Sequence, residues 1–135
     1  MRDDSWLKNR LEQIWELLFP DVPKKNFITV KFKGKWKNKF GHIKLLKDGT
    51  TEIAINSLFK DDRVPEYIID VTLAHELVHY LHGFCSPLKR KYKYPHAGGI
   101  VEKELKKRGF EHLLRKEKIF EKRWIKLYKL LTRKF

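Results

Sequence analysis

Cysteine is almost absent from this sequence: Cys85 is the only one among 135 residues. An internal disulfide is therefore excluded and a reducing compartment is favoured, so we expect a cytoplasmic protein. Long apolar runs are missing as well, since none approaches the roughly 18 residues that cross a bilayer. The first residues lead straight into a charged amphipathic stretch, which is not typical of a signal peptide. Together these absences predict a protein without a membrane partner.

Acidic side chains are also few: 17 Asp and Glu stand against 31 Lys and Arg, which gives a formal net charge of +14. The excess is concentrated in two segments. Residues 24–47 hold nine basic and no acidic side chains, and residues 86–135 hold seventeen basic and five acidic ones. Such a field favours a polyanionic partner, and we expect DNA or RNA to bind with little sequence preference. A lysine-rich solvated surface of the kind found in hyperthermophile proteins is the open alternative.

The chain length and a hydrophobic content of 41% suit a single globular domain with a real core. We expect this domain to span residues 1–135, with its core at about 24–110. Apolar residues at spacings of three and four predict two flanking helices. The first covers about residues 5–18 and ends before Pro20, and the last is a long, basic, amphipathic helix over about 111–131.

Between these helices the pattern changes to that of a small sheet. Lysines recur at every second position from Lys31 to Lys39, with apolar residues in the other phase, as in a strand with one wet and one buried face. This lysine ribbon can follow a phosphate backbone, or it can be the solvated face of an edge strand. Asp48-Gly49, between residues 41–46 and 51–55, predicts a hairpin. Together these segments predict a small antiparallel three-stranded sheet in an α+β domain.

The most informative stretch is His75-Glu76-Leu77-Val78-His79, within an uncharged run that predicts a buried helix. Positions four apart share one face of a helix, so His75 and His79 can present two imidazoles to one metal ion. Two His and a third protein ligand leave one zinc position open for water, which is the arrangement of a catalytic site. Glu76 is placed to take the proton of that water as it attacks a carbonyl.

Two residues compete for the place of the third ligand. His96 is favoured, because it stands just before a helix predicted over about residues 99–108 and follows a loop long enough to fold back. Glu102, one turn into that helix, would give a His-His-Glu site, which is another arrangement known for zinc hydrolases. His82 is interpreted as a residue at the end of the motif helix.

Three pieces of the chain are characteristic when taken together: residues 36–41 with the hairpin that follows, the motif at 75–79, and Pro95-His96-Ala97-Gly98-Gly99. In these the chain resembles the SprT-like metallopeptidases, the family that includes the Spartan-type DNA–protein crosslink proteases. The resemblance implies a zincin-like minimal fold, Zn²⁺ held by His75, His79 and His96, and Glu76 as the base. It also implies proteins, often DNA-bound ones, as substrates. Ala97 departs from the family's usual Gly, and one cysteine cannot supply the zinc ribbon that some members carry.

We therefore expect a zinc-dependent endopeptidase that hydrolyses a protein or peptide substrate. An extended substrate would pair with the free edge of the sheet, at about residues 41–46. Tyr92 and Tyr94 are candidates for stabilising the oxyanion, by their chemistry only. Two alternatives are a metal-dependent ribonuclease and a nucleic-acid-binding module with an idle metal site. The YbeY-like endoribonucleases have a superficially similar run, but Glu76 follows the first His here and their final His is absent.

Overall fold

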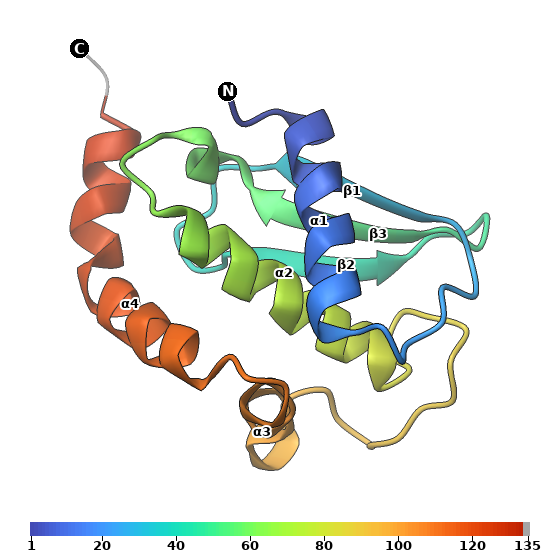
Figure 1. Ribbon diagram of the computed structural model, residues 1–135. Coiled ribbons are helices and arrows are strands. Elements are labelled where there is room, and N and C mark those ends of the chain that lie inside the picture. Colours follow the sequence, from blue (N-terminus) through green and yellow to red (C-terminus); the bar gives the residue numbers. More distant parts are fainter. Residues whose placement is uncertain (134–135) are drawn as a thin grey trace.

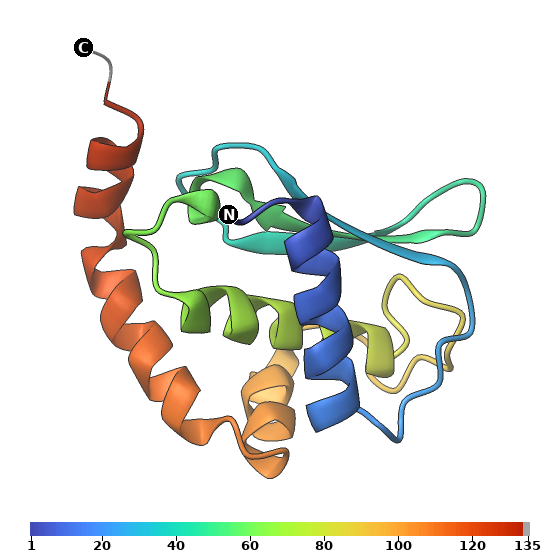
Figure 2. The same cartoon turned by 45° about the horizontal axis from the view of Figure 1, so that its top comes forward.

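The computed structural model describes residues 1–133, which form an α+β domain as the sequence predicts. Two helices, α1 and α2, pack against a three-stranded sheet, and α3 and α4 complete the helical side (Figures 1 and 2). The elements are α1 (Asp4–Leu18), β1 (Ile28–Lys33), β2 (Gly41–Leu45), β3 (Thr51–Asn56), α2 (Glu66–Leu81), α3 (Ile100–Lys107) and α4 (Glu111–Leu131). Two short 3₁₀ turns, Ser57–Lys60 and Ala97–Gly99, precede α2 and α3. None of the described helices is long and apolar enough to cross a membrane.

The sheet is mixed, and this corrects the prediction of a wholly antiparallel one. Strands β2 and β3 form the predicted antiparallel hairpin, with Gly41 opposite Ile55. Strand β1, however, pairs with β3 in parallel, and the strand order is β1-β3-β2. The cause is the connection after β1, which carries the chain past the position of β3 to the far edge of the sheet. Strand β3 is buried along its whole length, and β2 is an edge strand, as predicted.

The lysine ribbon is a strand over only part of its length. Strand β1 ends at Lys33, and Gly34 adopts a left-handed conformation with φ of 72°. The indole of Trp36 folds over Gly34 so closely that a Cβ there would lie 2.2 Å from the indole nitrogen. Lys35, Lys37 and Lys39 therefore belong to a loop, which the Asn56 side chain holds by donating to the carbonyls of Trp36 and Lys39, at 2.8 and 3.0 Å. The lysines still recur at every second position beyond Gly34, so their spacing alone overestimates the length of the strand.

Helix α1 anchors the domain from the N-terminal side. It begins at Asp4, one residue earlier than predicted, because the Asp3 side chain accepts the capping hydrogen bond from the Trp6 amide. Its buried face packs on α2 and β1. Arg10 reaches across to α2 and donates two hydrogen bonds to Asp70, at 2.5 and 2.8 Å. This bidentate pair fixes the first turns of the helix that carries the His-Glu-x-x-His motif.

Helix α2 is buried on nearly all sides, as the uncharged sequence around the motif predicts. Pro65 precedes its first turn and Gly83, at φ of 81°, follows its end.

Helix α4 covers the range predicted for the C-terminal amphipathic helix. Its Phe120 and Trp124 are buried, and the Trp124 indole donates to the Lys37 carbonyl at 2.7 Å. That bond ties α4 to the loop between β1 and β2.

Candidate metal centre and active site

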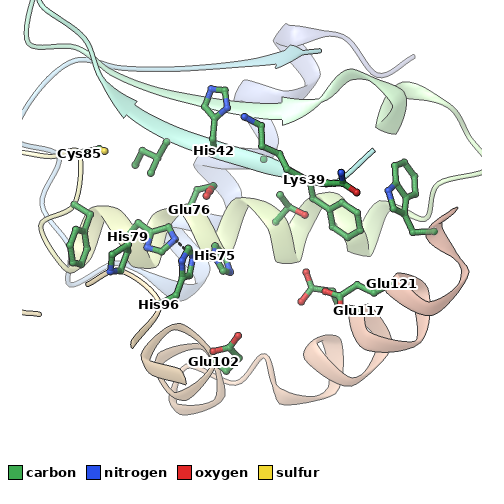
Figure 3. Close-up of a pocket in the computed structure, with 18 of the residues that line it drawn as sticks. Lys39, His42, His75, Glu76, His79, Cys85, His96, Glu102, Glu117 and Glu121 are labelled. Atoms are coloured by element: carbon green, nitrogen blue, oxygen red, sulfur yellow. Dashed lines mark hydrogen bonds between the residues drawn. The ribbon is translucent and has the colours of Figure 1, made fainter. Parts of the chain in front are cut away.

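The two histidines of the motif lie one turn apart on α2 and face the same pocket (Figure 3). Their ring centroids are 4.7 Å apart, and the rings meet edge to face. The helix around them is immobilised by its burial: Leu73, Ala74 and Val78 are completely inaccessible to solvent. A ligand pair carried by such a helix keeps its geometry, because neither the backbone nor the neighbouring side chains have room to move.

His96 arrives at the same place from the loop between α2 and α3. Its Nε2 lies 3.2 Å from the Nε2 of His75 and 3.0 Å from the Nε2 of His79. The structure therefore brings together the three histidines that the sequence singles out. Glu102, the competing candidate, lines the same pocket from the first turn of α3, but it is not part of this cluster of mutually close ligand atoms.

Backbone and side-chain hydrogen bonds hold the long loop that carries His96. The Phe84 amide donates to the His79 carbonyl at 2.9 Å, and the Lys91 amide donates to the His82 carbonyl at 2.9 Å. The Ser86 hydroxyl donates to the Tyr80 carbonyl at 2.8 Å. Gly98 and Gly99 then turn the chain into α3 with positive φ values of 62° and 67°. The loop is thus folded back onto the end of α2, as the position of His96 requires.

The geometry of the three nitrogens fits a tetrahedral zinc ion. Nitrogens bound at 2.0–2.1 Å in that geometry stand roughly 3.3 Å apart, which is close to the two separations from His96. Hydrogen bonding alone accounts for the cluster poorly. A neutral imidazole nitrogen either carries one proton or offers one lone pair, so the Nε2 of His96 cannot form a full hydrogen bond with both neighbours. One cation shared by the three lone pairs removes this conflict.

The electrostatics of the site keep these imidazoles in the form that binds metals. Burial, with a contribution from nearby His96, lowers the pKa of His75 to about 4. Burial and the neighbouring histidines lower the pKa of His79 to about 3. Both rings are therefore neutral at pH 7, and each can offer a lone pair without first losing a proton.

Glu76 lines the same pocket as the three histidines. It is 4% exposed, it lines the pocket, and its Oε2 has no hydrogen-bond partner within residues 1–133. Burial raises the pKa of Glu76 to about 8, and the charge of Lys39 acts in the opposite direction. A divalent cation held by the histidines would lower this pKa again and favour the carboxylate. A carboxyl group in this environment is poised to exchange a proton near neutral pH.

The pocket has a volume of about 690 Å³ and is lined by α2, α3, α4, β2 with the loop that leads into it, and the loop that carries His96. Sequence reasoning missed the part of its lining that comes from α4, namely Glu117, Glu121, Trp124 and Ile125. Their spacing along the chain is that of any amphipathic helix, so no signal in the sequence marks them. Only the return of α4 to the loop at Lys37 reveals that they belong to the site.

The two tyrosines considered for stabilising the oxyanion do not belong to the pocket lining. Tyr92 packs edge to face on His82, with ring centroids 4.8 Å apart, and neither Tyr92 nor Tyr94 lines the pocket. Their proposed role towards an oxyanion has no geometric support.

His82 caps the end of α2, as interpreted from the sequence, and its Nε2 lies 3.7 Å from Glu104. His42 lies on β2 at the rim of the pocket, next to Glu52 and the ring of Trp36.

Comparison of the chain with protein-family models, with curated proteins and with solved structures gave no match. The resemblance to the SprT-like metallopeptidases therefore stays a prediction, and the function of the site must be argued from its own geometry.

Proposed function

We propose that the chain is a zinc-dependent endopeptidase whose active centre is the pocket beside α2. The observation that carries this proposal is the convergence of three imidazoles at distances that suit one tetrahedral ion, in the pocket that the buried carboxyl of Glu76 also lines. His75, His79 and His96 would hold Zn²⁺. The ion would supply Lewis acidity, polarising the scissile carbonyl and making the attacking water more acidic.

The residues of this chain would carry the remaining steps. Glu76 accepts a proton from the water that attacks the peptide carbonyl, and the same carboxyl then delivers that proton to the leaving amine. Its burial keeps the group out of bulk water, so its proton goes to the substrate rather than to solvent. Strand β2, at the edge of the sheet, offers its unpaired side to an extended substrate next to the pocket.

The sharpest test is Glu76→Gln combined with two assays. Glutamine is nearly isosteric, so the protein should fold and bind one zinc per chain, but it cannot accept a proton. We expect cleavage of casein by the wild-type protein to stop on addition of a chelator, and to fall by about 10²–10⁴ in the variant. Near-wild-type peptidase activity in Glu76→Gln would contradict the mechanism, and loss of zinc would make Glu76 a ligand.

The same preparations decide between the alternatives. A metal-dependent ribonuclease would cleave RNA in a chelator-sensitive way and leave casein intact. A binding module with an idle metal site would cleave neither. For the partners, we propose peptide or protein substrates and non-specific contact with DNA or RNA through the basic surface. The cytoplasmic location stays a prediction from the single cysteine.

A further inference from the structure

Three carboxylates gather on the wall of the pocket opposite the sheet. Glu102 comes from the first turn of α3, and Glu117 and Glu121 lie one turn apart on α4. Figure 3 shows Glu117 and Glu121 side by side, with both carboxylates on the pocket side of α4. Two helices that are separate in sequence thus supply one acidic wall beside the histidine triad.

Among the described residues, these carboxylates line the pocket without a cationic partner. Several acidic groups elsewhere do have a cationic partner: Asp21 and Glu104 pair with Arg108, Glu52 with Lys31, and Asp70 with Arg10. Within residues 1–133, no such ion pair involves Glu102, Glu117 or Glu121, although the chain has 31 basic side chains. In a protein of this composition, three unpaired carboxylates in one pocket leave a position for a cation that the chain itself does not supply.

The cost of this arrangement is visible at Glu117. Burial and the repulsion from Glu121 and Glu102 raise the pKa of Glu117 to about 7. A positive charge placed among the three groups would relieve both effects, because it would stabilise the ionised form of each carboxylate. The acidic wall is therefore electrostatically unfavourable when the pocket is empty and favourable when a cationic group fills it.

A second feature of the pocket independently points to a ligand. Glu76, which is 4% exposed, faces the same cavity with an Oε2 that has no partner among the described residues. The cavity of about 690 Å³ is large enough for several side chains of a peptide. Trp124 and Ile125 add apolar surface beside the carboxylates. Aliphatic surface next to an acidic group suits the long stem and charged end of lysine or arginine.

We propose that the wall formed by α3 and α4 is a subsite for a lysine or arginine side chain of the peptide substrate. The inference rests on the proposed peptidase function and names its substrate class. Glu117 and Glu121 bind the cationic end, and Glu102 adds to the field. Lys39 stands on the side of the pocket nearer the sheet, across from this wall (Figure 3), so a cationic side chain is repelled there and directed to the acidic wall. The subsite therefore also sets the direction in which the peptide lies.

Binding to zinc-loaded Glu76→Gln protein tests the subsite without requiring cleavage. The probes are fluorescently labelled peptides that are identical except for one residue, which is lysine in one and norleucine in the other, placed in turn at each of six positions. At one position we expect the lysine peptide to bind about tenfold more tightly, as one charge-assisted contact in a partly buried site can provide. No preference at any of the six positions would overturn the proposal.

Second-site variants locate the effect. In the same background, Glu117→Gln with Glu121→Gln should bind the two peptides equally, and Glu117→Lys with Glu121→Lys should prefer a glutamate peptide at that position. The matched control is Glu12→Gln with Glu16→Gln, two exposed glutamates one turn apart on α1, far from the pocket lining. This control changes the net charge equally and should keep the preference for lysine. If it lost the preference as well, the effect would be one of overall charge, and the subsite would be refuted.

The outcome for the subsite and the outcome for the proposed function can be separated. A lysine preference that depends on Glu117 and Glu121, in a protein whose wild-type form cleaves none of the peptides, would support the subsite and contradict the peptidase. Cleavage by the wild-type protein without any lysine preference in binding would do the reverse.

Discussion

At the scale of single residues, the proposed metal centre depends on His96, the member of the histidine triad that does not lie on α2. Because its Nε2 stands 3.0 Å from that of His79, its removal should open the site on one side. We expect His96→Ala to lose most of its zinc affinity and Glu102→Ala to keep it. Zinc titration of the two purified variants against a competing chelator measures this. The opposite ranking would identify a His-His-Glu site.

A second residue-scale prediction concerns the pH dependence of stability. Glu117 has a pKa of about 7 in the folded chain, above its ordinary value of 4.5, so the folded state holds its proton more tightly than the unfolded state does. The stability that the protonated Glu117 side chain contributes is therefore fully present below about pH 4.5 and is lost as the pH rises through 7. Relative to wild type, Glu117→Gln should become more stable between pH 5 and pH 8.

Urea unfolding of the metal-free proteins, in the presence of chelator, measures this difference. Comparison of variant with wild type at each pH cancels the titration of the histidines, which both proteins share. Glu16→Gln, at an exposed position on α1, is the control and should follow the wild-type pH profile. A constant difference between Glu117→Gln and wild type at both pH values would show that Glu117 titrates normally.

At the scale of elements, the junction between α2 and the loop that carries His96 is the most constrained point of the site. Gly83 has φ of 81°, and a Cβ there would lie 2.5 Å from the Lys89 carbonyl oxygen and 2.6 Å from the backbone of Arg90. The loop that leads to His96 therefore passes directly over this glycine. Gly83→Ala should displace the loop and lower zinc affinity, although no ligand is changed.

Gly49→Ala is the matched control. Gly49 also has a positive φ, of 88°, but nothing lies within 4 Å of its position for a Cβ. Both variants should lose about 1–2 kcal/mol from the left-handed backbone, whereas only Gly83→Ala should weaken zinc binding as well. Thermal unfolding and zinc titration together separate the two effects. Equal zinc affinity in both variants would mean that the loop tolerates a shift of its backbone.

The elements also show which parts of the fold and of the site can be predicted from the sequence and which cannot. Helix α2, the β2–β3 hairpin and α4 were predictable, because their signals act locally: the uncharged run around the motif, Asp48-Gly49 and the spacing of apolar residues. His75, Glu76 and His79 follow from spacing on one helix. The parallel pairing of β1 with β3 was not predictable, since it depends on where the loop after Gly34 crosses the sheet. The acidic wall was missed for a similar reason: its members come from two helices, and only tertiary packing brings them to the histidines.

At the scale of the whole molecule, the lysines of the ribbon divide into two groups, those paired with an acidic residue and those exposed on a loop. Lys31 and Lys33 pair with Glu52 on the neighbouring strand, at 2.9 and 3.6 Å, whereas Lys35 and Lys37 are exposed on the loop. If nucleic acid binds this surface, contacts with phosphate release counterions, so affinity should fall steeply as salt increases. Fluorescence anisotropy with a labelled DNA duplex measures this dependence, and a flat response between low and moderate salt would leave the charge as surface solvation.

The two pairs of lysines provide a comparison at constant net charge. Lys35→Gln with Lys37→Gln should reduce the slope of log affinity against log salt by up to about 2, or roughly 0.9 for each lost phosphate contact. Lys31→Gln with Lys33→Gln should change it less, because these lysines already neutralise Glu52. Equal slopes for the two variants would mean that the overall field, and not the loop, attracts the nucleic acid.

The path of the chain between His79 and His96 has a consequence for folding. A cation shared by these two residues would close a loop, since they are 17 positions apart in sequence. It would act as a removable cross-link in a chain whose single cysteine cannot form an internal disulfide. A covalent cross-link over about 15 residues lowers the free energy of the folded state relative to the unfolded chain by about 3 kcal/mol. The ion would thus join the half of the domain built on α1, α2 and the sheet to the half built on α3 and α4, so that losing it would loosen the wall of the pocket along with the histidine triad.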